Sequence, residues 1–171
     1  MGGEARVMAL RPEAEESDEV AVVPAARSLR VLPLAALDRV GVVLVSHSAR
    51  VAESVAELAV ELLGTGDPAP LATAGGDGDG RVGTSTALVL AAAKRADQGM
   101  GVAVVADLGS AVTAVQVVLA SAEANGLPFP LRLADAPFLE GAVAAVATAS
   151  AGGDLAAVVE AAEDAYVVRK L

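Results

Sequence analysis

VGVVLV, residues 40–45, is an apolar run in which hydrophobic side chains do not alternate with polar ones. A strand buried on both faces of a sheet has this composition, because neither side of it meets water. Ser46, His47 and Ser48 follow the run at once. Residues 49–63 then place apolar side chains at helical spacing. This unit predicts a buried strand that ends in a polar turn and leads into a helix.

The same alternation of strand and helix continues along the chain. We predict three further strands over residues 70–74, 101–106 and 129–134. We predict further helices from a cap at Thr84 or Ser85 to about 96, from after 107–110 to about 124, over 138–150, and from 154 to about 167. This order predicts an α/β fold, with a doubly wound, mainly parallel sheet of four to five strands and helices on both faces.

Three polar loops directly follow predicted strands, namely 46–48, the glycine-rich segment 75–85, and 107–110. In a parallel sheet the carboxyl ends of the strands share one edge, and ligands bind there, near a switch in strand order. We therefore expect the three loops to converge on one crevice.

His47, the only histidine of the chain, is the centre of this expected site. A neutral imidazole nitrogen is nucleophilic near pH 7. Free N–H groups and the dipole of the following helix would stabilise a phosphoryl group there. Asp107 can accept a hydrogen bond from the second ring nitrogen and so fix the tautomer. We expect the hydroxyl and amide donors of the phosphate site to come from eight residues: Ser46, Ser48, Gly75, Gly76, Thr84, Ser85, Gly109 and Ser110.

Each of these features has an alternative interpretation. A lone histidine is often structural, and Asp107 can be an ordinary helix cap. The glycine-rich segment lacks the spacing and the lysine of a nucleotide-binding loop. Asp77 and Asp79 alternate as calcium ligands do, but the remaining ligand positions of a calcium loop are missing, which favours a solvated acidic turn.

Composition restricts the class of protein further. The net charge of −10 and the three aromatic residues do not fit nucleic-acid or anionic-membrane binding. The absence of cysteine excludes disulfides and thiolate metal sites, and we expect no metal. No apolar run has transmembrane length and no signal-peptide pattern is present, so we expect a cytoplasmic protein. The acidic, proline-containing segment 1–38 is predicted to be a flexible arm before one domain, 39–171.

Four segments, in this order, resemble the signature blocks of the DhaM family: VLVSHS (43–48), AGGDGDGRVGTS (74–85), DLGSA (107–111) and DAPFLEGA (135–142). DhaM is the phosphotransfer subunit of the phosphoenolpyruvate-dependent dihydroxyacetone kinase. The resemblance implies a fold like the mannose-type EIIA domains and a homodimer.

The resemblance also implies a phosphotransferase function. His47 would accept a phosphoryl group from HPr and deliver it to ADP held on the DhaL subunit, whose ATP serves the DhaK subunit. ADP, ATP and magnesium would then belong to the partner, with no cofactor bound by this chain. Since the chain carries one domain, a separate protein would have to phosphorylate it.

Two other functions remain open from the sequence. The same fold can serve as a mannose-type IIA carrier that feeds a sugar permease, although the third block, 107–111, resembles the dihydroxyacetone branch. The crevice can also belong to a non-catalytic module that binds a small anion or a partner.

Overall fold

Four parallel strands form the sheet in the described part of this computed structural model, which covers residues 38–64, 66–122, 124, 126–127 and 129–168. The strands are β1 (Gly41–Ser46), β2 (Leu71–Gly75), β3 (Val102–Ala106) and β4 (Leu131–Ala134), in the order β2-β1-β3-β4. The predicted α/β class and parallel sheet are confirmed. The predicted arm, apart from its last residue, lies outside the described residues.

The helices follow the strands as predicted: α1 (Ala49–Leu62), α2 (Thr86–Ala96), α3 (Gly109–Ala120), α4 (Phe138–Ser150) and α5 (Leu155–Glu163), with a final 3-10 turn, η2 (Asp164–Val167). α3 ends short of the predicted end near 124. The Ser121 hydroxyl donates to the carbonyl of Val117 at 2.7 Å, and the Leu127 N–H donates to the carbonyl of Ala122 at 3.0 Å, so the chain turns there.

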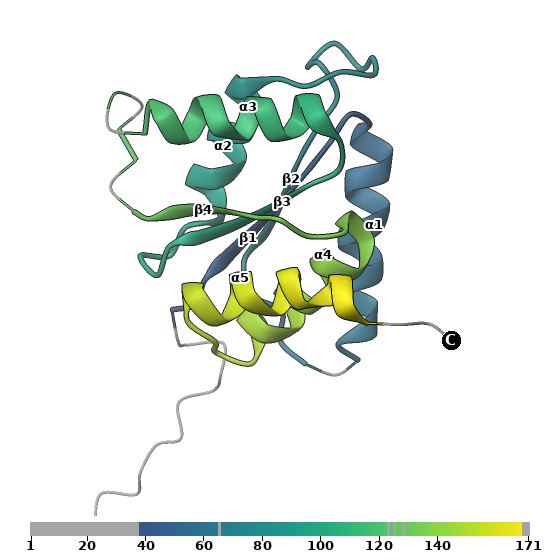
Figure 1. Cartoon of the computed structure of the whole chain (residues 1–171), viewed down its shortest axis with the longest axis vertical. Coiled ribbons are helices and arrows are strands. Elements are labelled where there is room, and N and C mark those ends of the chain that lie inside the picture. The colour runs from purple at the N-terminus through teal and green to yellow at the C-terminus, as the bar shows by residue number, and fades with distance from the viewer. Residues whose placement is uncertain (1–37, 65, 123, 125, 128, 169–171) are drawn as a thin grey trace, which may run out of the picture. The chain divides into compact units, whose positions relative to one another are not determined.

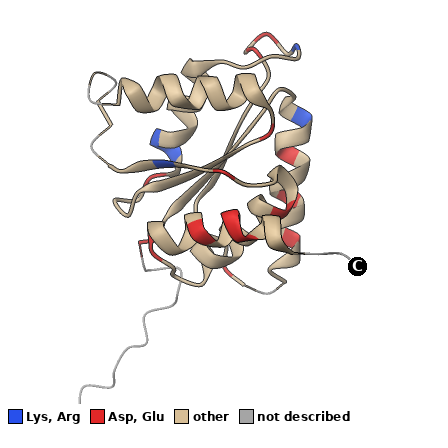
Figure 2. Ribbon diagram, viewed as in Figure 1, with Lys and Arg blue, Asp and Glu red and all other residues tan. Residues whose placement is uncertain are grey.

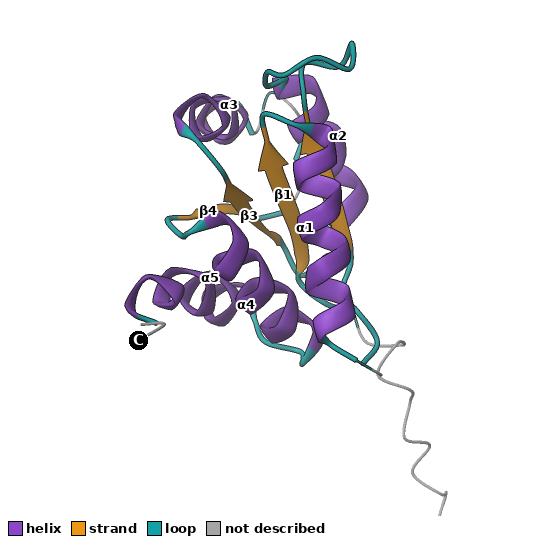
Figure 3. Ribbon diagram, turned by 90° about the vertical axis from the view of Figure 1, so that its right-hand side faces the viewer, coloured by secondary structure: helices purple, strands orange, loops and turns teal. Residues whose placement is uncertain are grey.

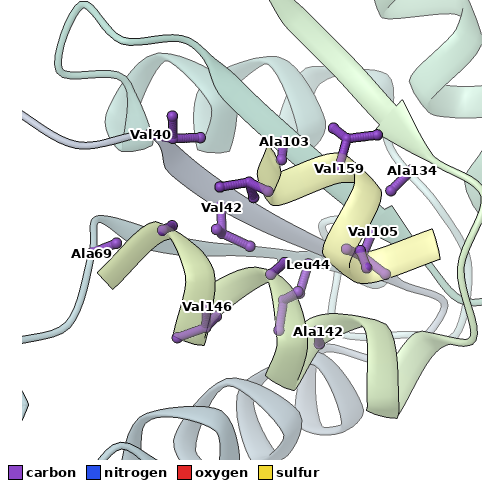
Figure 4. Packing of buried hydrophobic residues seen from close by; sticks show 14 of the residues in the cluster. Val40, Val42, Leu44, Ala69, Ala103, Val105, Ala134, Ala142, Val146 and Val159 are labelled. Carbon is purple, nitrogen blue, oxygen red and sulfur yellow. The ribbon is translucent and has the colours of Figure 1, made fainter. Parts of the chain in front are cut away.

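Two apolar clusters lie on opposite faces of the sheet. One joins α1, α4 and α5 to the side chains of Val42, Leu44 and Val105, and Figure 4 shows part of it. The other joins α2 and α3 to Val43 and Val104. Helices therefore cover both faces, as Figures 1 and 3 show, with α2 and α3 on one side and α4 and α5 on the other.

The two central strands are buried along their whole length, which explains the unbroken apolar run of β1. Their side chains are mostly valine and alanine, and Leu44 is among the largest that are fully buried. Each valine that is fully buried contributes about 1.5–3 kcal/mol relative to an exposed one. β1 and β3 are thus the most deeply buried strands of the sheet, and the loops at their carboxyl ends begin from fixed positions.

The register of the strands places the predicted site loops side by side at the carboxyl edge of the sheet. Val45 of β1 pairs with Ala74 of β2 on one side and with Ala106 of β3 on the other. α1 leaves β1 over one face of the sheet, whereas α3 leaves β3 over the opposite face. The space between the ends of β1 and β3 is therefore the switch point at which open α/β sheets bind ligands.

Gly75, the last residue of β2, lies against the start of α1. A Cβ atom at this position would lie 2.7 Å from the backbone nitrogen of Ala49 and 2.9 Å from the carbonyl carbon of Ser48. Both are backbone atoms, so no side-chain rotation relieves the contact. Gly75 is therefore required for close packing of β2 against the turn that carries His47.

We predict that Gly75→Ala lowers the free energy of unfolding by about 1–3 kcal/mol, since an inserted methyl group must push backbone aside. Urea unfolding measures this change. Gly66→Ala is the matched control, because a Cβ there meets its neighbours at 3.4 Å or more. Equal stability of the two variants would contradict the proposed packing role.

Candidate phosphoryl-transfer site

His47 is the first residue after β1 and lies two residues before α1. Its side chain is 22% exposed, so the ring is neither enclosed in the core nor free in solvent. The backbone around it is fixed on both sides. The buried strand holds Ser46, and the His47 carbonyl accepts the Gly83 N–H at 2.9 Å. The ring is thus presented at the carboxyl edge of the sheet from a rigid support.

Asp107, directly after β3, holds His47 through both of its carboxylate oxygens. Oδ1 lies 2.9 Å from ring atom Nδ1, and Oδ2 accepts the backbone N–H of His47 at 3.0 Å. An ionised carboxylate only accepts hydrogen bonds, so Nδ1 carries the ring proton in the neutral imidazole. The lone pair is then on Nε2. The predicted role of Asp107 in fixing the tautomer agrees with this geometry.

Two further donors complete the surroundings of the carboxylate. The Ser46 hydroxyl donates to Oδ2 at 2.7 Å, and the Leu108 N–H donates to Oδ1 at 2.6 Å. Burial alone would raise the pKa of Asp107. The hydrogen bonds from the His47 N–H, the Ser46 hydroxyl, the His47 ring and the Leu108 N–H outweigh burial, and the pKa lies below its usual value. Asp107 is therefore ionised at neutral pH.

Nε2 of His47 lies in hydrogen-bond contact with the Ser110 hydroxyl. Ser110 is the second residue of α3, and its carbonyl is 3.5 Å from the Thr84 hydroxyl. Because Nε2 holds a lone pair, Ser110 is the donor in the contact. Ser110 and Thr84 were both predicted to belong to the phosphate site. The structure brings them together near Nε2 of His47.

The first turns of α1 and α3 supply free amides at the same edge. The first intrahelical bonds are those of Ala52 to Ser48 and of Val112 to Leu108. Neither helix has a side-chain cap, and in the described part of the chain no acceptor is bound by the amides of 49–51 and 109–111. Unpaired N–H groups and the positive ends of two helix dipoles favour an anion such as a phosphoryl group.

The glycine-rich loop is tied to the end of β1. The Gly76 N–H donates to the Ser46 carbonyl at 3.2 Å, and the Gly83 N–H donates to the His47 carbonyl. Gly76 was predicted to donate to phosphate, but its N–H is already used, and Gly75 is needed for packing. The loop therefore positions the histidine backbone, and the Gly76 N–H is not a phosphate donor in this geometry.

The remaining predicted residues fall into two groups. Ser46 was predicted to be a hydroxyl donor of the phosphate site, but it is buried and its hydroxyl donates to Asp107. Ser48 is half-buried and its hydroxyl makes no capping bond. Ser85 caps α2 by accepting the Leu88 N–H at 3.4 Å. Gly109 begins α3 with open space around its Cα.

A groove of about 540 Å³ lies beside the Nε2 side of His47. It runs between α2 and α3 and its lining is mostly hydroxyl-bearing: Asp77, Thr84, Ser85, Thr86, Ser110, Thr113, Ala114 and Val117. The groove offers an approach to the Ser110 end of the ring for a group that carries or accepts phosphate.

Arg50 is exposed in the first turn of α1, the helix that follows His47. Arg81 is engaged with Asp77 and Asp79 inside the glycine-rich loop, which is exposed at its tip, as predicted for an acidic turn. Glu53, Glu57 and Glu61 are all exposed on α1, and the ribbon in Figure 2 marks acidic residues in red on α1 and α5. Among the described residues, no cluster of acidic, histidine or cysteine side chains can hold a metal ion.

The arrangement is that of a nucleophile within an anion site. Nε2 carries a lone pair, Asp107 stabilises positive charge on the ring, and the helix starts that follow β1 and β3 have no side-chain caps. No helix in the described residues has the length and apolar character needed to cross a membrane.

Comparison with known proteins agrees with this geometry. The family model EIIA-man, described as PTS system fructose IIA component, matches residues 41–159, which is more than half of the chain. A curated relative, PEP-dependent dihydroxyacetone kinase 2, phosphoryl donor subunit DhaM of Listeria innocua, is 31% identical over 62% of this chain and 82% of its own length. This chain belongs to the DhaM family.

Other DhaM relatives are longer. The subunits of Pantoea ananatis and Escherichia coli are each 35% identical, over 77% and 68% of this chain, but the chain spans only 28% and 25% of their lengths. Among solved structures, the unknown function protein EF1359 matches with a TM-score of 0.62 at 26% identity, over 74% of this chain and 94% of that protein. The DhaM resemblance and the EIIA-like fold are thus confirmed.

We predict that Asp107→Asn loses a stabilising effect that depends on pH. The pKa of Asp107 is lowered by folding, so its contribution is complete above the unfolded value of about 3.9 and is lost as pH falls through the lower folded pKa. The stability gap between parent and variant should be largest near neutral pH and should narrow below about pH 4. Urea unfolding at several pH values measures this difference in the free energy of unfolding. A difference that does not change with pH would contradict a lowered pKa of Asp107 in the folded protein.

Proposed function

We propose that this chain is a phosphohistidine carrier, the phosphoryl donor subunit of a dihydroxyacetone kinase system. The observation that carries the proposal is the orientation of His47, whose Nδ1 is bound to Asp107 while Nε2 contacts the Ser110 hydroxyl at the start of α3. Membership of the DhaM family supports it, because the curated relatives are named phosphoryl donor subunits of PEP-dependent dihydroxyacetone kinase.

The first transfer is an in-line attack of the Nε2 lone pair on the phosphorus of the donor, HPr. The N–P bond forms while the bond from phosphorus to the donor atom breaks, and its electron pair leaves with HPr. The ring gains positive charge, which the Asp107 carboxylate balances across Nδ1–H. The amides of α1 and α3 and the Ser110 hydroxyl stabilise the charge on the equatorial oxygens.

The second transfer reverses these steps with a different acceptor. A terminal phosphate oxygen of ADP, bound to the DhaL subunit, attacks phosphorus as the N–P bond breaks, and Nε2 regains its lone pair. The ATP so formed serves dihydroxyacetone on the DhaK subunit. Nucleotide and magnesium then belong to the partner, and this chain acts as a homodimer in the cytoplasm without a cofactor of its own. A protein with one nucleophile meets both partners through the same face.

We predict that His47→Ala abolishes phosphoryl uptake and leaves the fold intact, because the half-buried ring is not part of either apolar cluster. Intact-mass measurement at alkaline pH, with phosphoenolpyruvate, enzyme I and HPr, should show one added phosphoryl group on the parent and none on the variant. Acid treatment of the parent should remove the adduct.

If the His47→Ala variant still takes up a phosphoryl group, the nucleophile is another residue. No adduct on the parent under any donor would favour the non-catalytic binding module instead.

A second candidate is a mannose-type IIA carrier that feeds a sugar permease, and the description of the matching family model as a fructose IIA component favours it. The acceptor separates the two functions. We predict that the phosphorylated chain transfers its phosphoryl group to ADP in the presence of DhaL, giving ATP. Transfer to the IIB domain of a sugar permease, with none to ADP on DhaL, would establish the second candidate.

A further inference from the structure

We propose that Ser46 is a positioning residue for the transfer at His47, acting through the Asp107 carboxylate. This inference rests on the proposed function and assigns to Ser46 a role that differs from the phosphate contact expected from the sequence. The evidence is its burial, its two hydrogen bonds and its place in the strand register.

Burial excludes direct contact with an incoming phosphoryl group. Ser46 is 1% exposed, at the end of β1, between β2 and the fully buried strand β3. The polar residues that are buried in the described part of the chain are only Arg39, Ser46 and Ser150. A buried hydroxyl is retained where it has partners, and the partner of Ser46 is the carboxylate beside the nucleophile.

Two hydrogen bonds fix the direction of the hydroxyl proton. Ser46 Oγ accepts the backbone N–H of Ser48 at 3.2 Å and donates to Oδ2 of Asp107 at 2.7 Å. The chain of bonds therefore runs in one direction, from the first amide before α1, through the hydroxyl, to the carboxylate. Donors in such a chain polarise one another and strengthen the last bond.

The bond to Oδ2 determines what Oδ1 can do. With Oδ2 held by the Ser46 hydroxyl and by the His47 N–H, the plane of the carboxylate is fixed and Oδ1 faces Nδ1 of His47. Removal of the hydroxyl leaves Oδ2 with one donor, so that the orientation of the carboxylate is fixed less firmly by the remaining bonds from His47 and the Leu108 N–H. The Nδ1–H tautomer would then be held less firmly, and Nε2 would present its lone pair for a smaller fraction of the time.

The surroundings of Asp107 make this effect measurable. His47 is the one titratable group that contacts the carboxylate within the described residues; the other contacts come from Ser46 and from the amides of His47 and Leu108. Loss of the Ser46 donor should therefore raise the pKa of Asp107 without a competing change in a second charged neighbour.

The test compares Ser46→Ala with Ser150→Ala. Ser150 is a matched control because it is also buried, 6% exposed, and its hydroxyl also accepts a backbone N–H, from Ala69 at 2.9 Å, at the end of α4. Both variants lose a buried hydroxyl. Only the first loses a contact with the carboxylate.

Two readouts are needed, and the first requires no phosphoryl donor. In the unphosphorylated protein, NMR of the His47 ring nitrogens and of the Asp107 carboxyl carbon should show a weakened preference for the Nδ1–H tautomer and a raised Asp107 pKa in Ser46→Ala. In the second readout, the initial rate of phosphoryl uptake from HPr should fall roughly ten-fold or more in Ser46→Ala. The acid limb of the plot of uptake rate against pH should also move to higher pH. Ser150→Ala should match the parent in both.

The outcomes separate this inference from the proposed function. If the parent takes up a phosphoryl group and Ser46→Ala titrates and reacts as Ser150→Ala does, the positioning role is wrong. If the parent takes up no phosphoryl group but the tautomer and the Asp107 pKa still change, the hydroxyl positions the carboxylate and the transfer function fails. Should Ser46→Ala not fold, Ser46→Cys, with a weaker donor of similar size, must show the same changes to a smaller degree.

Discussion

The contact between the Asp107 carboxylate and both the ring and the backbone of His47 is the constraint on which the site depends. It joins the ends of the two central strands at the point where they diverge into helices on opposite faces. A single carboxylate thereby fixes the orientation of the ring, the location of its proton and the spacing of two loops. The fold thus orients Nε2 in advance, and such positioning lowers the barrier of a reaction at that atom.

The rest of the molecule supports this contact with packing instead of charge. Valine and alanine side chains bury β1 and β3 on both faces, and the close approach of Gly75 brings β2 against the turn before α1. Two helix starts without side-chain caps leave their amides for an anion.

The central strand and the place of the site were predictable from the sequence, whereas the side-chain contacts within the site depend on how the strands pair. The unbroken apolar run 40–45 gave the central strand, and the position of His47 after it gave the place of the site. The partners of individual side chains depend on the pairing of Val45 with Ala106 in the sheet, and no local sequence pattern specifies this pairing. Ser46 was therefore expected to face phosphate and Gly76 to donate to it, whereas the first bonds Asp107 and the second bonds a strand carbonyl. A serine that ends a fully apolar strand was the available signal that its hydroxyl needed an interior partner.

The glycine-rich loop is fastened at both of its ends, by Gly76 and Gly83, and its tip at 78–82 is exposed. Because the cost of closing a loop grows slowly with its length, added residues at the tip would leave the two anchoring bonds in place. The tip is thus a suitable point at which to insert a short tag.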